Sequence, residues 1–242
     1  MKNYIDKIAV CGNENRRNAI CKILEELKIS YSIKGDTCNN IVVSNDVQGK
    51  KIVIGAHYDV FAENCPGAND NGAACVILLN LIENLRESKR LYEFVFFDKE
   101  EKGMEGSRAY IEIVGKNNIE AMINLDMCGM GNNIVLAKKD FNNILTKEPY
   151  KSIINECKNV FTQLPPGDNG SFEHEHIPFI FIINSTDNDL NWYSKFAKSG
   201  IVWGYQTTDF FKTMHKETDT IGTINIKGVE NIYNYLLDKL NK

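Results

Sequence analysis

The sequence predicts an α/β fold in which a largely parallel sheet is covered by helices on both faces. Two observations support this fold class. Apolar segments of strand length alternate along the chain with longer segments in which apolar residues have helical spacing, and several strand segments are apolar enough to be buried on both faces. The chain has 242 residues, 43% of them hydrophobic, which is sufficient for a sizeable core.

The N-terminal half contributes five predicted elements. Apolar residues at helical spacing predict a helix over 15–27, and short apolar segments predict strands over 41–44 and 52–56. Residues 73–85 form a strongly apolar segment of helical length. Residues 92–97 predict a buried strand, because four of the six are aromatic and a fifth is valine.

The C-terminal half continues the alternation. Helices are predicted over 106–114 and 149–160, and strands over 122–125 and 179–183. The chain closes with a predicted helix over 227–240, whose apolar residues gather on one side. Ligands of such sheets bind beyond the carboxyl ends of the strands, so residues with chemical roles should follow strands directly.

Composition and charge limit the organisation and the partners. No linker or repeat divides the chain, so residues 1–242 are expected to form a single domain. The net charge of −4, with acids and bases spread along the chain, argues against nucleic-acid and membrane partners. Residues 1–10 lack a signal-peptide core, which favours a cytoplasmic location, with a mature secreted form as the alternative. The seven cysteines include no C-x-x-C pair and are expected to be mostly reduced and packed. The oligomeric state is left open.

Histidine and carboxylate side chains follow the predicted strands. His57 and Asp59 come directly after one strand, Glu100 and Glu101 follow the next, and Asp126 follows a third. Each alone has a commoner explanation, such as a structural histidine, a turn former or a solvated charge pair. Their shared position beyond strand ends instead favours a common site.

Asp70 and His215 extend this group of residues. Alone, Asp70 would be a helix cap before the 73–85 helix, and His215 a surface polar residue. Together, the imidazole and carboxylate groups suit Zn²⁺ without cysteine ligands. The clustered carboxylates would otherwise repel and raise one another's pKa values, and two Zn²⁺ ions bring the matching positive charge.

The spacing within two motifs has a physical meaning. His57 and Asp59 are two residues apart, so their side chains can lean to the same side, where one binds metal and the other orients the imidazole. Glu100 and Glu101 are adjacent, and the following Gly103 allows the turn that would aim both at one site. One carboxylate could then hold metal while the other moves a proton.

The motifs together resemble the bacterial leucyl aminopeptidase type of di-zinc exopeptidases, a family that also contains glutamate carboxypeptidases and the related glutaminyl cyclases. The resemblance spans residues 50–222 and implies a three-layer α/β/α sandwich with a central mixed, mostly parallel sheet. The matching segments are Gly55-Ala-His-Tyr-Asp59, Pro66-Gly-Ala-Asn-Asp-Asn-Gly72, Glu100-Glu-Lys-Gly-Met-Glu-Gly-Ser107, Asn124-Leu-Asp-Met127, and His215 with Asp219-Thr220.

The resemblance implies a ligand set for two Zn²⁺ ions, for which Co²⁺ or Mn²⁺ could substitute. Asp70 would bridge the two ions. His57 and Asp126 would complete one site, and Glu101 and His215 the other.

It also implies a reaction, the removal of N-terminal amino acids from peptides with a free N-terminus. Glu100 would be the general base acting on a water activated by both zinc ions, and Asp59 would be the partner of His57. Selectivity is expected to lie in residues 184–211, although core packing is an equally good explanation for their rings. The aromatic residues of this segment are Trp192, Tyr193, Phe196, Trp203, Tyr205, Phe210 and Phe211.

One segment departs from the family pattern. Where the family shows Ser-Asp-His, this chain has Gly167-Asp168-Asn169, so Asp168 is kept as a candidate substrate-binding residue while the histidine is missing. Three alternatives stay open: a glutaminyl cyclase, which is an acyltransferase with a single zinc, a carboxypeptidase, and a non-catalytic binding protein. The intact Glu100 and the five ligand positions argue against the last of these.

Overall fold

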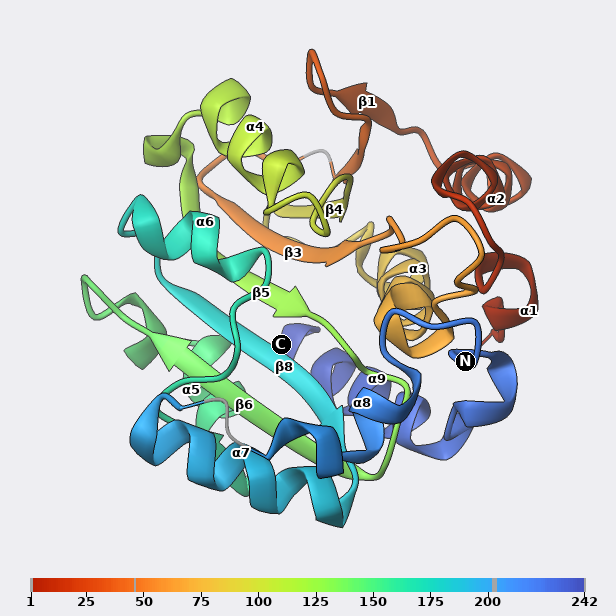
Figure 1. Cartoon of the computed structure of the whole chain (residues 1–242). Helices are drawn as coiled ribbons and strands as arrows, with labels where there is room; N and C mark the ends of the chain where they lie inside the picture. The colour runs from red at the N-terminus through yellow and green to blue at the C-terminus, as the bar shows by residue number, and fades with distance from the viewer. Residues whose placement is uncertain (1, 46, 202–203, 242) are drawn as a thin grey trace.

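The computed structural model describes residues 2–45, 47–201 and 204–241, and its strands form an eight-stranded mixed sheet (Figure 1). The strand order is β1-β2-β4-β3-β5-β8-β6-β7. The strands are β1 (Ser32–Lys34), β2 (Asn40–Ser44), β3 (Lys51–His57), β4 (Tyr92–Phe97), β5 (Ile119–Leu125), β6 (Asn133–Lys139), β7 (Asn159–Phe161) and β8 (Phe179–Ser185). The four central strands, β4, β3, β5 and β8, are parallel to one another, whereas β2 and β6 pair with them in antiparallel fashion.

Helices cover both faces of this sheet. In Figure 1, α4, α6 and α7 lie in front of the sheet and α9 lies behind it. The α-helices are α1 (Ile5–Ile8), α2 (Asn13–Glu26), α3 (Ala73–Leu85), α4 (Glu105–Val114), α5 (Tyr150–Asn155), α6 (Asn169–His174), α7 (Asp187–Ser199), α8 (Asp209–Thr213) and α9 (Ile226–Leu240). Short 3₁₀ turns occur at Lys116–Asn118, Ile144–Thr146, Tyr205–Thr207 and Ile221–Thr223. The α/β fold with a mixed central sheet between helices is therefore confirmed.

Two hydrophobic cores lie on opposite faces of the sheet. Within β3, Ile52 and Ile54 belong to the core that contains α3 and α9, whereas Val53 belongs to the core that contains residues of α4, α6 and α7. Strands buried on both faces lack the polar alternation of half-exposed strands. This is why the central strands could be recognised from their apolar residues alone.

The structure differs from the sequence-based expectation mostly in its C-terminal half, although α1 and β1 in the N-terminal half were not predicted either. The helix predicted over 149–160 is wrong beyond α5, because the chain turns at residues 156–158 and continues as β7, which pairs with β6. Strand β6 was not predicted at all. Residues 184–211 contain α7 and the first residues of α8, and Trp203 of that segment lies outside the described residues.

Two further features bear on the class of protein. Within the described ranges, every helix is too short or too polar to cross a membrane. All seven cysteines are free thiols, and four of them are buried, in agreement with the expectation of reduced, packed side chains.

Candidate active site

The side chains singled out in the sequence converge at the carboxyl ends of the central parallel strands. His57 is the last residue of β3, Asp126 directly follows β5, and Glu100 and Glu101 lie in the turn after β4. These three strands are neighbours in the sheet and point the same way, so the residues that follow them emerge at one edge.

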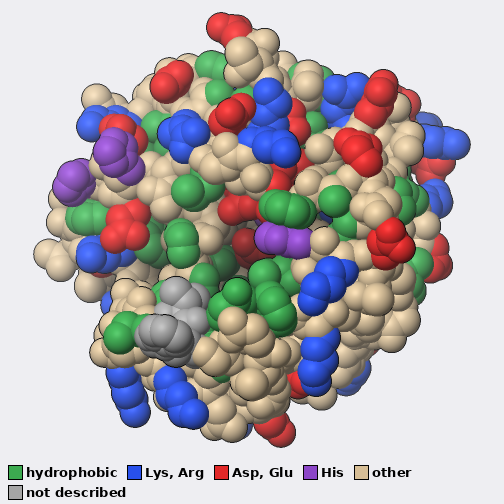
Figure 2. All heavy atoms as spheres, viewed as in Figure 1, with side chains coloured by type: hydrophobic (Ala, Val, Ile, Leu, Met, Phe, Trp, Pro, Cys, Tyr) green, Lys and Arg blue, Asp and Glu red, His purple; other side chains and the backbone are tan. Residues whose placement is uncertain are grey.

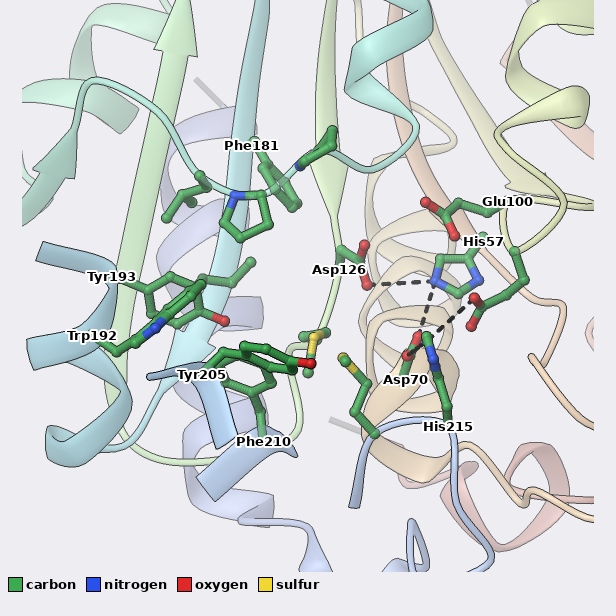
Figure 3. Close-up of a pocket in the computed structure, with 17 residues that line it drawn as sticks. His57, Asp70, Glu100, Asp126, Phe181, Trp192, Tyr193, Tyr205, Phe210 and His215 are labelled. Atoms are coloured by element: carbon green, nitrogen blue, oxygen red, sulfur yellow. Dashed lines mark ion pairs between the residues drawn. The ribbon is translucent and has the colours of Figure 1, made fainter. Parts of the chain in front are cut away.

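Asp70 and His215 reach the same place from other directions. Asp70 lies in η1 (Ala68–Gly72), a turn directly before α3 in which Asp70 itself has a non-helical backbone, and His215 lies in the loop after α8. Figure 3 shows the imidazoles of His57 and His215 both next to Asp70, with dashed lines marking the ion pairs.

The five predicted ligands form two groups of three that share Asp70. In the first group, His57 Nε2 lies 3.2 Å from Asp70 Oδ1 and 3.5 Å from Asp126 Oδ1. In the second, His215 Nε2 lies 3.3 Å from Asp70 Oδ2 and 3.2 Å from Glu101 Oε2. Asp70 thus offers one carboxylate oxygen to each group.

These distances fit zinc. Nitrogen and oxygen ligands about 2.0–2.2 Å from one tetrahedral ion lie roughly 3.3–3.6 Å from each other, close to the separations seen in both groups. In addition, Asp126 Oδ1 is buried without a hydrogen-bond donor among the described residues. A buried acceptor that lacks a donor is costly, and a cation would satisfy it. The donor set and its geometry therefore suit two Zn²⁺ ions bridged by Asp70.

Asp59 orients both the histidine and the adjacent glutamates. Both its backbone carbonyl oxygen (3.2 Å) and its Oδ1 (3.3 Å) lie near His57 Nδ1, so acceptors of Asp59 can set the imidazole tautomer. The same carboxylate accepts the backbone N–H of Glu100 (3.0 Å) and of Glu101 (3.1 Å). The sequence indicated only the first contact, because the second depends on β3 and β4 being neighbours in the sheet.

Asp219 fixes the backbone around Asp70. Its two carboxylate oxygens accept the backbone N–H groups of Asn69 (2.8 Å) and Asp70 (3.0 Å). The side chain of Asn69 in turn accepts the N–H of Gly129 (2.8 Å). Asp219 belonged to a recognised motif, but no role for it could be inferred from the sequence.

Phe61 is a neighbour of the site that sequence reasoning missed. Its ring stacks on the imidazole of His215, with centroids 4.3 Å apart and planes 6° from parallel, although the side chain is 52% exposed. An exposed aromatic ring on a candidate ligand limits the directions in which that imidazole can turn.

The charges of the cluster perturb one another strongly. Burial disfavours protonation of His57, yet Asp126, Asp59 and Asp70 outweigh it and raise the pKa of His57 well above its usual value. For Asp70, burial favours the neutral acid, but His215 and His57 prevail and lower its pKa. Without cations the two histidines thus take the role of positive partners for the carboxylates.

The surroundings of Glu100 shift its pKa strongly. Burial, together with the charges of Asp126, Asp168 and Glu101, raises the pKa of Glu100 to about 9 in the absence of cations. Bound Zn²⁺ would favour its charged form and bring this pKa down. The side chain lines the pocket beside His57 (Figure 3).

The pocket at this edge has a volume of about 370 Å³. One side carries Glu100 and the five candidate ligands, and the other is apolar and aromatic (Figure 3). Figure 2 shows the opening as a hollow with carboxylates inside and hydrophobic side chains around it. The other lining residues are Met127, Leu164, Pro165, Pro166, Phe181, Ile183, Trp192, Tyr193, Tyr205, Phe210 and Met214.

Asp168 is close to the site but is not among the residues that line the pocket. It is buried, and burial raises its pKa to about 7. Contact between Asp168 and substrate therefore stays a prediction. Asn169, at the position of the family's histidine, accepts hydrogen bonds from Asn124 Nδ2 (3.4 Å) and from the N–H of Gly167 (3.3 Å). The replacement therefore holds its own loop against β5.

Curated proteins with similar sequences include aminopeptidases. The aminopeptidase YwaD of Bacillus subtilis is 34% identical over 83 residues, which is 32% of this chain and 18% of that protein. The curated relatives are longer proteins, of which this chain covers between 9% and 26%.

Solved structures share the fold at low identity. A zinc aminopeptidase from Bacillus subtilis is 20% identical with a TM-score of 0.62, over 83% of this chain and 49% of that one. A glutaminyl cyclase from Macrostomum lignano is 18% identical with a TM-score of 0.68, over 98% of this chain and 87% of that one. Residues 40–239, which include all five candidate ligands and Glu100, match Peptidase family M28, so the chain belongs to that family.

Proposed function

We propose that this chain is a two-zinc aminopeptidase that removes an apolar N-terminal residue from peptides with a free N-terminus. The observation that carries the proposal is the pair of ligand groups sharing Asp70, placed beside Glu100 at the edge of an apolar pocket. Membership of Peptidase family M28 supports peptide hydrolysis, and the likeness to a zinc aminopeptidase supports the choice of metal.

The ligands divide into two groups of three, each with one imidazole and two carboxylates. His57 and Asp126 would hold one ion and Glu101 and His215 the other, with Asp70 between them. Zinc bound there would acidify a water molecule and polarise the scissile carbonyl. Four carboxylates, counting Glu100, provide the negative charge that two divalent cations require.

Glu100 would take the proton from the attacking water and later deliver it to the leaving amine. Its backbone is fixed by Asp59, and its carboxylate faces the pocket beside the ligands. General acid–base groups work best with a pKa near the working pH. For Glu100, burial raises the pKa and neighbouring cations would lower it. These opposing effects on the pKa would suit Glu100 both to accept the proton from water and to deliver it to the leaving amine.

The composition of the pocket supports selection of an apolar N-terminal residue. The free α-amine of the substrate would lie on the side of the candidate ligands, whereas none of the remaining described lining residues carries a formal charge. An apolar wall with a few polar groups at one end is the usual form of a specificity pocket. The substrate side chain would therefore lie against residues such as Tyr193, Tyr205 and Phe210.

Two assays on zinc-saturated protein test the proposal. We expect two zinc ions per chain and hydrolysis of an unblocked leucyl amide, with little cleavage of its N-acetylated counterpart. The control substrate is a peptide with N-terminal glutamine. One tightly held zinc with pyroglutamate as product would show a cyclase instead, and preferred cleavage at the carboxyl end of N-blocked peptides would show a carboxypeptidase.

A further inference from the structure

Arg16 is a completely buried cation on α2 that binds the backbone of a distant segment. Its Nη1 donates to the carbonyl oxygen of Tyr58 (3.2 Å), and its Nη2 donates to those of Gly67 (2.8 Å) and Pro66. Buried arginines are rare and usually paired with carboxylates or phosphates. Here the acceptors are three carbonyl groups, at the two ends of residues 58–67.

These ten residues join two candidate metal ligands. His57 precedes them at the end of β3, and Asp70 follows them in η1. The separation of His57 Nε2 and Asp70 Oδ1, which is 3.2 Å, depends on how this connection is folded. A planar guanidinium that binds both ends of the connection constrains their relative position more than a single contact could.

A second side chain of α2 contacts the same connection. Asn13 Oδ1 accepts the backbone N–H of Val60 (2.7 Å), and Asn13 and Arg16 are three residues apart, on one face of the helix. Gly67 has a left-handed backbone with φ of 53°, and a Cβ atom there would lie 2.6 Å from Nη2 of Arg16. Glycine at this position is therefore part of the same contact.

The charge of Arg16 argues against a direct role in attracting metal. Burial lowers the pKa of its guanidinium, and neighbouring groups that include Asp70 and Asp219 oppose that shift. An arginine stays protonated in proteins, so Arg16 would repel cations bound by Asp70. Arg16 can therefore support metal binding only through its hydrogen bonds to the backbone and not through its charge.

We propose that Arg16 is a positioning residue of the metal centre, which keeps His57 and Asp70 at metal-binding distance by holding both ends of residues 58–67. The proposal rests on the proposed two-metal function. Because α2 precedes residues 40–239, this contribution comes from outside the region that matches the family.

The test is the variant Arg16→Met, which keeps an unbranched side chain and removes every donor. At a temperature where circular dichroism shows the variant to be folded, its zinc affinity should be about tenfold or more below that of the wild type, as for other groups that orient ligands. With zinc added to saturation, kcat should stay reduced while KM changes little. Loss of the positive charge of Arg16 alone would tighten zinc binding, whereas loss of its hydrogen bonds should weaken it. The direction of the change in zinc affinity therefore separates these two effects.

Arg17→Met is the matched control, because Arg17 is the next residue of α2 and pairs with Glu14 (3.7 Å) near the surface. Its zinc affinity should equal that of the wild type. Arg16→Lys keeps the charge but cannot reach all three carbonyls, so its affinity should be intermediate, and it replaces Arg16→Met if that variant does not fold. A folded Arg16 variant that binds zinc as tightly as the wild type overturns the inference, whereas a wild type that binds no zinc refutes the proposed function instead.

Discussion

The two sides of the pocket are built in different ways. On the metal side, His57, Asp126 and the Glu100-Glu101 pair come from the ends of neighbouring parallel strands and are held by hydrogen bonds and ion pairs. On the apolar side, rings from α7 and α8 pack on one another, as in the stacked pair Tyr193 and Phe210. Chemistry requires particular atoms at particular distances, whereas a selective wall requires only shape and an apolar surface.

This contrast predicts that changes on the metal side abolish turnover and that changes on the apolar side alter substrate choice. The predictions below test this division, from the largest expected effect to the smallest.

Removal of metal should have the largest effect. A strong chelator should abolish activity and lower Tm by about 5 °C or more, because cations that bind only the folded state stabilise it. Added Zn²⁺ or Co²⁺ should restore both, as measured by thermal melts and a peptidase assay. The control is Asp70→Ala, which should show no shift of Tm with chelator. An unchanged melting curve after verified metal removal would contradict the metal centre.

The adjacent glutamates should respond differently to the same substitution. Glu100→Gln should reduce kcat by roughly 10²–10⁴-fold, because it removes the proposed base while keeping the size of the side chain. Its metal content should stay near that of the wild type, whereas Glu101→Gln should lose metal from the site that contains His215. Elemental analysis and kinetics of both variants measure this, and the reverse pattern would exchange the two roles.

The apolar side should control selectivity without affecting metal. Tyr205→Ala should lower kcat/KM for the best apolar substrate by about tenfold, because part of the wall that contacts the substrate is lost. Zinc content should be unchanged, and Tyr31→Ala, outside the pocket, is the control. A panel of aminoacyl amides gives the measurement. If acidic or basic N-terminal residues were cleaved best, the proposed role of this wall would be wrong.

The smallest effect is expected at Phe61, whose aromatic ring stacks on the imidazole of the candidate ligand His215. Stacked aromatic pairs contribute about 0.5–1.5 kcal/mol, so Phe61→Ala should weaken zinc binding at the His215 site by roughly two- to tenfold. Zinc titration measures it. The control is Ile113→Ala, because Ile113 is exposed to the same extent, 52%, but lies on α4. Equal affinities in both variants would leave the stacking without a function.

Sequence reasoning was most successful where local pattern and chemistry coincide. β3, β4 and β5 are apolar on both faces and end at or directly before a histidine or an acid, so they could be located together with the residues that follow them. It failed for β6 and β7, which lie at one side of the sheet. β7 has only three residues, too few for a pattern, and its pairing with β6 provides the hydrogen bonds that a longer α5 would otherwise make.

The sequence by itself determined which residue types could act: an apolar parallel core, imidazoles and carboxylates after its strands, and motifs specific enough to indicate a family. Only the tertiary structure decided their partners, such as the second role of Asp59 and the contacts of Asp219, Phe61 and Arg16. The physical reason is distance along the chain. A ligand's identity is local, but its orientation depends on contacts such as that of Asp219 with Asp70, which are 149 residues apart in sequence.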